Sequence, residues 1–173
     1  MIPSTAIDLI RRSANPLLVS HVNPDGDAVG SVVGMGWMLE SLGKKVTLAL
    51  QDAVPPEFCT LPGADRIVGV EAVADAYDLI ICLDAGSQDR MGKVYKPEHK
   101  ATPLLVIDHH VTNTRFGAVN WVAPECAATC QMLVELADAL AVPLNGALAH
   151  CLLTGIVTDT LCFRTSNTTP AVL

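Results

Sequence analysis

The sequence predicts an α/β fold with a mainly parallel sheet and helices on both faces. Most of its strand-like segments are nearly continuous apolar runs rather than alternating patterns, which is typical of strands that are buried on both sides. These segments are residues 17–22, 45–50, 66–70, 78–84 and 103–108. Helical patterns lie between or after them, at residues 27–42, 124–140 and 145–159. This alternation indicates strand–helix–strand units with right-handed crossovers.

The composition supports a well-developed core and limits the classes of function. Half of the 173 residues are hydrophobic and 17% are charged. No apolar run reaches the roughly 18 residues of a membrane-spanning helix, so we expect no membrane association. The six cysteines form no CxxC pair and no secretion signal precedes them, which indicates free thiols in a cytoplasmic protein. The net charge of -7, without a basic run, disfavours binding of long nucleic acid but allows a short phosphorylated ligand.

Titratable residues stand at the carboxyl ends of three predicted strands. These residues are His21, Asp84 and Asp108. Ligands of open α/β sheets bind beyond the carboxyl ends of the strands. We therefore expect the three side chains to lie together in one site at that edge of the sheet. The loop after His21 adds Asp25 and Asp27. A Pro-Asp-Gly turn followed by Asp27 as a helix N-cap explains these two acids without any ligand.

Two further groups of residues are candidates for the same site at the edge of the sheet. Asp108 is followed directly by His109 and His110, and neighbouring side chains near a strand end point in different directions. We therefore expect the two histidines to do different work, such as binding a metal and contacting a phosphate. Asp159 lies in an otherwise apolar segment, where a cation would offset the cost of burying a carboxylate. Hydrogen bonds to neighbouring threonines or to a helix end are the alternative for Asp159.

This collection of ligands predicts a metal site. Several carboxylates in one site repel one another and cannot all remain ionised without bound cations. Carboxylate and imidazole ligands without a thiolate suit Mn²⁺, Mg²⁺, Fe²⁺, Co²⁺ or Zn²⁺. There are more candidate ligands than one catalytic ion can bind while keeping a position open. We therefore expect two ions about 3.5–4 Å apart, bridged by one carboxylate. Arg90, in the loop after Asp84, is either a phosphate contact or part of a surface ion pair.

Four segments resemble the successive motifs of the DHH phosphoesterases. They are HVNPDGDAVGS (21–31), LDAGSQDRMG (83–92), DHHVTNTRFG (108–117) and TDTLCFRTSNTTP (158–170). The segments VNWVAPECAATC (119–130) and FRTSNTTP (163–170) are most similar to the RecJ-like branch of nanoRNases and 3′-phosphoadenosine 5′-phosphate phosphatases. Members of this branch carry a second, C-terminal DHHA1 domain with a glycine-rich substrate-binding motif, which is absent from this sequence.

The end of the sequence also resembles the start of another helix. Thr169 stands where an N-cap would lie and Pro170 occupies the first helical position. We therefore expect residues 1–173 to form the DHH catalytic domain at the N-terminal end of a longer, two-domain protein.

The resemblance implies a role for each candidate residue. The implied ligands of one ion are His21, Asp25 and Asp84, and those of the other are Asp27, Asp84, His109 and Asp159, with Asp84 bridging. Mn²⁺ is the family's usual metal, with Mg²⁺ or Co²⁺ as alternatives. His110 would contact the scissile phosphate with help from Arg90, and Asp108 would orient a histidine. Asn113 and Arg115 are further candidates for substrate contacts, or else turn and surface residues.

The predicted function is hydrolysis of short oligoribonucleotides, or of 3′-phosphoadenosine 5′-phosphate, by a metal-activated water. A cyclic dinucleotide phosphodiesterase, a single-strand 5′ exonuclease and an inorganic pyrophosphatase of the same superfamily are alternatives. A non-catalytic nucleotide-sensing module is the alternative of a different class, but every expected ligand is present. A dinucleotide-binding domain is disfavoured because Gly30, Gly34 and Gly36 lie inside a helical pattern, where we expect them to permit close helix packing. The sequence is also compatible with a homodimer.

Overall fold

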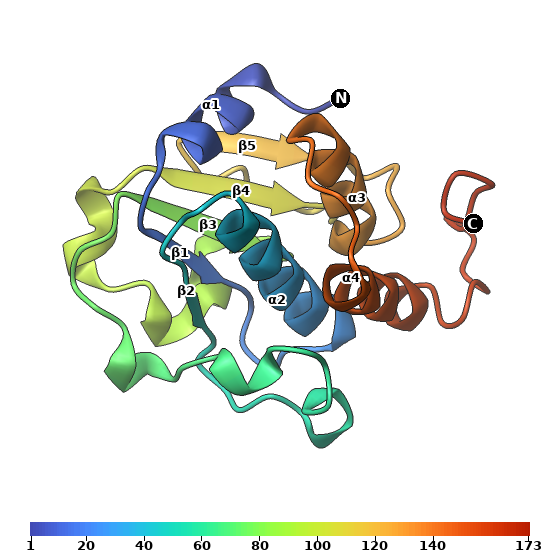
Figure 1. Ribbon diagram of the computed structural model, residues 1–173, viewed down its shortest axis with the longest axis horizontal. Coiled ribbons are helices and arrows are strands. Elements are labelled where there is room, and N and C mark those ends of the chain that lie inside the picture. The colour runs from blue at the N-terminus through green and yellow to red at the C-terminus, as the bar shows by residue number, and fades with distance from the viewer.

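A five-stranded parallel sheet runs through the centre of the computed structural model, which describes residues 1–173 (Figure 1). Its strands are β1 (Pro16–Val19), β2 (Thr47–Ala49), β3 (Leu79–Leu83), β4 (Leu104–Asp108) and β5 (Val119–Val122). The order is β2-β1-β3-β4-β5, and every pair of neighbours is parallel. The expected α/β class and parallel sheet are confirmed.

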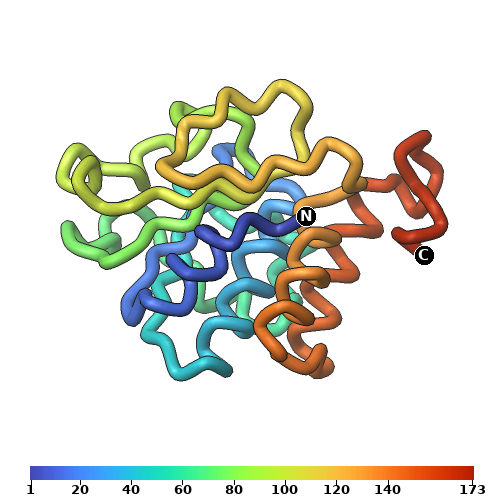
Figure 2. The backbone as a smooth tube through the Cα atoms, turned by 90° about the horizontal axis from the view of Figure 1, so that it is seen from above, coloured from blue at the N-terminus to red at the C-terminus, as the bar shows by residue number.

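The two faces of the sheet are covered by different kinds of helix, and the α-helices gather on one side of it (Figure 2). One face packs against the α-helices, which are α1 (Ser4–Arg12), α2 (Gly26–Ser41), α3 (Thr129–Ala139) and α4 (Gly146–Asp159). The other face packs mainly against short 3₁₀ helices, which are η3 (Val70–Ala72), η4 (Gln88–Val94) and η5 (Pro97–Ala101), with the segments between them. Two more 3₁₀ helices, η1 (Pro56–Phe58) and η2 (Ala64–Arg66), follow β2. The α-helical side holds 33 buried core residues and the other side 11, so most of the core lies under the α-helices.

The order of the strands explains why α-helices cover one face of the sheet and 3₁₀ segments the other. The connection from β1 to β2 runs toward one edge of the sheet, whereas those from β2 to β3 and from β3 to β4 run toward the other. Right-handed crossovers of opposite direction lie on opposite faces, so α2 covers one face and the 3₁₀ segments cover the other. The direction changes between β1 and β3, and the carboxyl ends of these two strands are where a ligand site is expected.

One predicted strand is wrong. Residues 66–70 contain only an isolated bridge, in which Val68 lies beside Ala49. The Val68 N–H donates to the Leu48 carbonyl at 2.9 Å, and the Leu50 N–H donates to the Val68 carbonyl at 3.2 Å. Because η2 and η3 lie on either side, the pairing stops at this single residue.

Other element boundaries also differ from expectation. The sequence patterns did not predict α1, of which only Ala6 and Ile10 are buried, or the edge strand β5. The helix predicted from residue 124 begins at Thr129, because Ala128 has an extended backbone. At the predicted C-terminal helix start, the Val172 N–H donates to the Thr169 carbonyl at 2.9 Å and forms a turn instead of a helix.

No helix of the structure has both the length and the apolar character needed to cross a membrane. All six cysteines are free, and four of them are buried, namely Cys82, Cys126, Cys130 and Cys151. These four therefore contribute to packing rather than to cross-linking.

Glycines let α2 approach its neighbours closely, as expected from the sequence. A Cβ on Gly30 would lie 2.6 Å from the carbonyl oxygen of Cys151 in α4. A Cβ on Gly34 would lie 2.7 Å from the Leu152 side chain, and one on Gly36 equally close to the Leu48 side chain of β2. The contact at Gly30 is with backbone, which cannot rotate away, so α2 and α4 can hold this separation only with glycine at that position.

We expect Gly30→Ala to destabilise the chain by about 1–3 kcal/mol, because the added methyl group overpacks a backbone contact. This corresponds to a fall in Tm of roughly 2–10 °C for a domain of this size. Gly146→Ala is the matched control, since Gly146 also lies in a helix but a Cβ added there would meet nothing within 4 Å. Thermal unfolding followed by circular dichroism measures both, and an unchanged Tm for Gly30→Ala would contradict the packing argument.

Candidate metal centre

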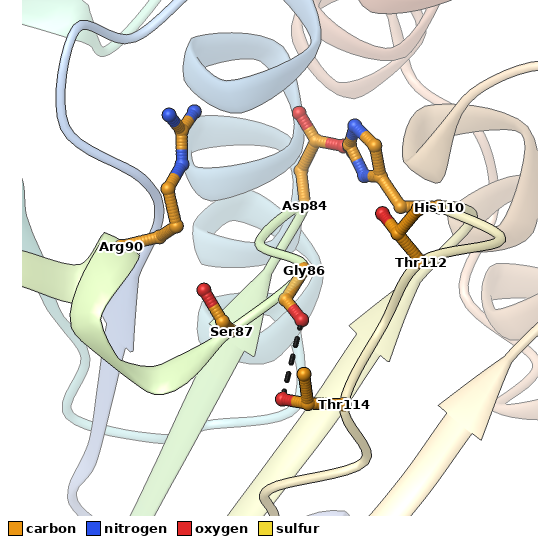
Figure 3. A pocket seen from close by; sticks show the side chains of 7 residues that line it. All are labelled: Asp84, Gly86, Ser87, Arg90, His110, Thr112 and Thr114. Carbon is orange, nitrogen blue, oxygen red and sulfur yellow. Dashed lines mark hydrogen bonds and ion pairs between the residues drawn. The ribbon is translucent and has the colours of Figure 1, made fainter.

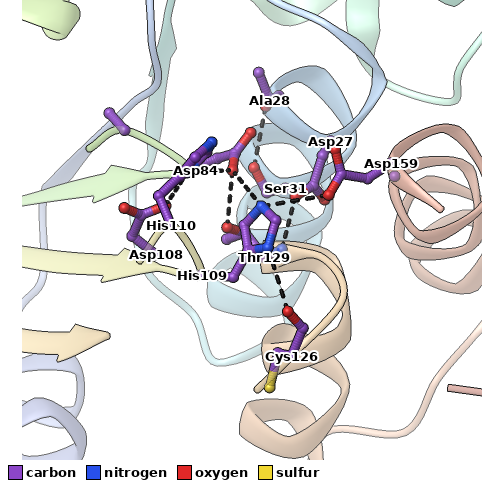
Figure 4. Close-up of polar contacts among 12 residues, drawn as sticks. Asp27, Ala28, Ser31, Asp84, Asp108, His109, His110, Cys126, Thr129 and Asp159 are labelled. Atoms are coloured by element: carbon purple, nitrogen blue, oxygen red, sulfur yellow. Dashed lines mark hydrogen bonds and ion pairs between the residues drawn. The ribbon is translucent and has the colours of Figure 1, made fainter. Parts of the chain in front are cut away.

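The carboxyl ends of three adjacent strands place the central residues of the site. His21 lies two residues beyond β1, Asp84 directly follows β3, and Asp108 is the last residue of β4. Asp84 has a left-handed backbone with φ 57°, which aspartate tolerates better than most residues. Its N–H donates to the Ile107 carbonyl at 3.0 Å, so this turn remains anchored to β4. As expected, these residues lie close together at one edge of the sheet: His21 Nε2 is 3.5 Å from Asp84 Oδ2, and His110 Nδ1 lies near both Asp84 and Asp108. Figure 4 shows Asp84 and Asp108 side by side with the two histidines.

The first group of possible metal ligands consists of His21, Asp25 and Asp84. The His21 Nδ1 lies 2.8 Å from the Val22 carbonyl, which can only accept, so Nδ1 carries a proton and donates it. The other ring nitrogen, Nε2, lies 3.7 Å from Asp25 Oδ2 and 3.5 Å from Asp84 Oδ2. A backbone carbonyl that holds one nitrogen and leaves the other facing carboxylates is a common support for a metal-binding histidine.

The second group consists of Asp27, His109 and Asp159. His109 Nδ1 donates to the Cys126 carbonyl at 3.3 Å. Its Nε2 lies 3.3 Å from Asp159 Oδ2 and 3.5 Å from Asp84 Oδ1. Asp84, a member of the first group, therefore turns Oδ2 toward His21 and Oδ1 toward His109 of the second group. A third possible group is Asp84, His109 and His110, since His110 Nδ1 lies 3.7 Å from Asp84 Oδ1.

The two acids of the first loop have different structural partners. Asp25 is the N-cap of α2, and its Oδ1 accepts from the N–H groups of Asp27 and Ala28 at 3.1 and 3.0 Å. The alternative that Asp27 caps this helix is therefore wrong. Asp27 instead accepts from the Thr129 and Cys130 N–H groups at 2.6 and 2.9 Å, at the beginning of α3.

The electrostatics of the cluster favour bound positive charge. Asp27 and Asp84 are only 1% and 2% exposed, and no lysine or arginine forms an ion pair with any carboxylate of the two groups. Burial, followed by the charge of Asp84, raises the pKa of Asp27 well above its usual value. Burial also raises the pKa of Asp159. Burial opposes protonation of His21, but the carboxylates of Asp25 and Asp84 outweigh it and raise the pKa of His21 to about 10.

Asp108 and His110 form a separate hydrogen-bonded pair. Asp108 is fully buried, and its Oδ1 accepts from His110 Nδ1 at 2.7 Å. Its Oδ2 accepts from Asn113 Nδ2 at 2.6 Å, so the Asn113 side chain supports Asp108. The hydrogen bond that His110 donates to Asp108 is the largest cause that raises the pKa of His110 to about 9. The His110 side chain is 45% exposed, which leaves its Nε2 free to donate to a ligand.

A polar cavity of about 430 Å³ opens beside Asp84 and His110 (Figure 3). Its lining residues are Asp84, Gly86, Ser87, Arg90, His110, Thr112 and Thr114. Arg90 lies on the opposite wall from Asp84 and His110, so a group between them would meet the Arg90 guanidinium on one side and the His110 imidazole on the other. The exposed Arg115 is not among the lining residues, and its role as a substrate contact stays a prediction.

Sequence reasoning missed four polar residues of the site. Ser87, Thr112 and Thr114 supply hydroxyl groups to the cavity, and the fully buried Thr129 donates from Oγ1 to Asp84 Oδ1 at 3.1 Å. All four lie within segments already quoted as similar to the family, but an uncharged serine or threonine carries no periodic pattern that would single it out there. Thr129 lies within the predicted helix at residues 124–140, and nothing in that pattern marked it as a partner of the carboxylates.

Comparisons with known proteins agree with the geometry. Residues 16–156 match the model of the DHH family, N-terminal domain. A bifunctional oligoribonuclease and PAP phosphatase NrnA of Thermus thermophilus is 37% identical over 168 residues, which are 96% of this chain and 50% of the relative. The Bacillus subtilis protein of the same name is 28% identical over 162 residues, or 91% of this chain and 50% of that protein.

A solved structure has the same fold. The crystal structure of an exopolyphosphatase-related protein from Bacteroides fragilis superposes with a TM-score of 0.87 and 28% identity, covering 95% of this chain and 51% of the other. The chain spans about half the length of the curated relatives it matches. With the family model matched from β1 to α4, the chain belongs to the DHH family and contains its N-terminal domain.

Proposed function

We propose that this chain is a metal-dependent phosphoesterase that hydrolyses short oligoribonucleotides and 3′-phosphoadenosine 5′-phosphate. The observation that supports the proposal most is the central position of Asp84, whose Oδ2 faces His21 and whose Oδ1 faces His109. The names of the Thermus and Bacillus relatives, an oligoribonuclease and PAP phosphatase, support the choice of substrates.

The donor set fits a pair of divalent cations. The proposed ligands are His21, Asp25 and Asp84 for one ion and Asp27, Asp84, His109 and Asp159 for the other. All donors are carboxylate oxygens or imidazole nitrogens, which suit Mn²⁺ as well as Mg²⁺ or Co²⁺. We propose Mn²⁺, because the mixture of imidazole and carboxylate is softer than the all-oxygen set that Mg²⁺ prefers.

The residues around the cavity supply the remaining chemistry. When bound, a pair of divalent cations activates a water nucleophile and offsets negative charge on the phosphoryl oxygens. His110 donates from Nε2 to a phosphoryl oxygen, and Asp108 holds the ring in the orientation that this requires. Arg90 approaches the same phosphate from the opposite wall, where its planar guanidinium can donate two hydrogen bonds.

The polar lining of the cavity indicates which part of the substrate would bind there. None of its seven residues is hydrophobic, and three of them offer hydroxyl groups. Such a surface matches phosphate and sugar oxygens better than the flat face of a base, which stacks on aromatic or apolar side chains. A panel of di- to pentanucleotides, 3′-phosphoadenosine 5′-phosphate, a cyclic dinucleotide and pyrophosphate, each with Mn²⁺, tests the substrate class. Turnover of pyrophosphate or the cyclic dinucleotide alone would contradict the proposal.

We expect Asp84→Asn to abolish Mn²⁺-dependent hydrolysis, lowering kcat at least 10²-fold, because the shared carboxylate loses its charge. Asparagine has the same shape and also tolerates the left-handed backbone at this position, so the fold should persist. Asp89→Asn is the matched control, since Asp89 is exposed in η4 and belongs to none of the possible ligand groups. Undiminished hydrolysis by Asp84→Asn would eliminate the shared-carboxylate arrangement.

Mn²⁺ should stabilise the chain, because cations offset the repulsion among the buried carboxylates. At a free Mn²⁺ concentration about a hundred times Kd, binding adds about 2.7 kcal/mol, or roughly 5–10 °C in Tm for a domain of this size. Chelation with EDTA should reverse the shift, and Asp84→Asn should lack it. Differential scanning calorimetry measures these changes. A Tm of the unmodified chain that does not change when Mn²⁺ is added would count against a metal centre.

The two adjacent histidines should respond differently to substitution. We expect His109→Ala to weaken Mn²⁺ binding, since Nε2 of His109 lies between Asp84 and Asp159. His110→Ala should keep the Mn²⁺ affinity but lower kcat about 10²–10³-fold, as loss of one donor to a developing charge does elsewhere. Isothermal titration with Mn²⁺, paired with steady-state kinetics, separates the two roles. Equal losses of Mn²⁺ affinity in both variants would show that His110 is also a ligand.

A further inference from the structure

Thr129 is fully buried where α3 meets the carboxylates of the site (Figure 4). Its N–H donates to Asp27 Oδ2 at 2.6 Å, and its hydroxyl donates to Asp84 Oδ1 at 3.1 Å. No other residue forms hydrogen bonds to the side chains of both acids. Thr129 thus connects a carboxylate from α2 with one from the end of β3.

The backbone of α3 contributes the first part of this connection. The N-cap residue Ala128 provides no side-chain hydrogen bond, so the first N–H groups of α3 need another acceptor. Asp27 supplies it, with Oδ2 accepting from Thr129 and Oδ1 from Cys130. The positive end of the helix dipole also offsets part of the charge of this buried carboxylate. Both oxygens of Asp27 are therefore fixed by main-chain groups.

The Thr129 hydroxyl contributes the second part. The other polar partners of the Asp84 carboxylate are His21, His109 and His110, at 3.5–3.7 Å, which is too long for a good hydrogen bond. The hydroxyl therefore forms the one short hydrogen bond to this carboxylate. It restrains the rotation that would otherwise exchange the oxygen facing His21 with the oxygen facing His109.

We infer that Thr129 is a positioning residue that orients the shared carboxylate of Asp84 and so couples the two cation sites. The inference rests on the proposed metal-dependent function and assigns to Thr129 no contact with substrate or metal. Removing the hydroxyl leaves Asp84 free to turn toward either group of ligands, so a second ion is bound more weakly and is no longer joined to the first through a fixed carboxylate.

The test compares Thr129→Val with Thr129→Ser in the full chain. Valine has nearly the shape of threonine and keeps the N–H that binds Asp27, so α3 keeps its acceptor. Serine keeps the hydroxyl but loses the methyl group. Thr154→Val is the control for the same exchange elsewhere, since the Thr154 hydroxyl bonds only to the His150 carbonyl of its own helix. The probe is Mn²⁺ alone, followed by electron paramagnetic resonance and by titration.

In the unmodified chain, we expect two bound Mn²⁺ ions with an exchange-coupled spectrum, because one carboxylate joins them. Thr129→Val should bind at least one ion about 10–100-fold more weakly and lose the coupled signal. Thr129→Ser and Thr154→Val should keep both the affinities and the coupled spectrum. In steady-state assays, Thr129→Val should lower kcat more than it raises KM.

Two results would overturn the inference alone. One is a Thr129→Val chain that keeps both Mn²⁺ affinities and the coupled spectrum. The other is a Thr129→Ser chain that is impaired as much as Thr129→Val, which would assign the effect to packing of the methyl group. An unmodified chain that binds no coupled pair of Mn²⁺ ions would overturn the two-ion proposal itself, and the inference with it.

Discussion

The burial of neighbouring carboxylates without a lysine or arginine partner is the constraint on which this structure depends. Asp27 and Asp84 are almost completely buried, and Asp159 is partly buried beside His109. Removing such groups from water costs several kcal/mol each unless other groups offset the charge. The chain offsets part of it with helix amides, one hydroxyl group and imidazoles, which carry only partial or exchangeable positive charge. The remaining negative charge favours cations, so the proposed metal binding would use the same buried residues that make folding costly.

The fold creates this arrangement by bringing distant segments unusually close together. The change of direction between β1 and β3 sets His21 beside Asp84, while α2 and α4 must converge for Asp27 and Asp159 to meet His109. A Cβ on Gly155 of α4 would lie 2.6 Å from Asp27 Oδ1, so any side chain there would displace this carboxylate. Close helix packing is therefore part of the site and not only of the core.

Features of the site that arise within a short stretch of sequence could be predicted, whereas contacts between residues far apart in the chain could not. Strand ends are visible as apolar runs that stop at a polar residue, and parallel topology then forces His21, Asp84 and Asp108 to the same edge. The partner of Asp27 was not predictable, because the amide that binds it lies 102 residues away along the chain. The failed strand at residues 66–70 has the same origin. Its apolar pattern suits a strand, but only Val68 reaches the edge of β2.

The triplet Asp108-His109-His110 shows how one strand end supplies three different groups. Both oxygens of Asp108 are occupied by His110 and Asn113, so this acid supports its neighbours and has no oxygen free of a protein partner. His110 uses Nδ1 for Asp108 and keeps only its exposed Nε2, which can donate to an anion in the cavity. His109 uses Nδ1 for a carbonyl and points Nε2 between two carboxylates. The two rings lie close together, with centroids 4.6 Å apart, and both approach Asp84 Oδ1. Only His109 also faces Asp159, whereas the His110 side chain is 45% exposed beside the cavity. The unlike roles proposed for these two identical residues therefore rest on the partners of their ring nitrogens, which are a carbonyl and two carboxylates for His109 and the Asp108 carboxylate for His110.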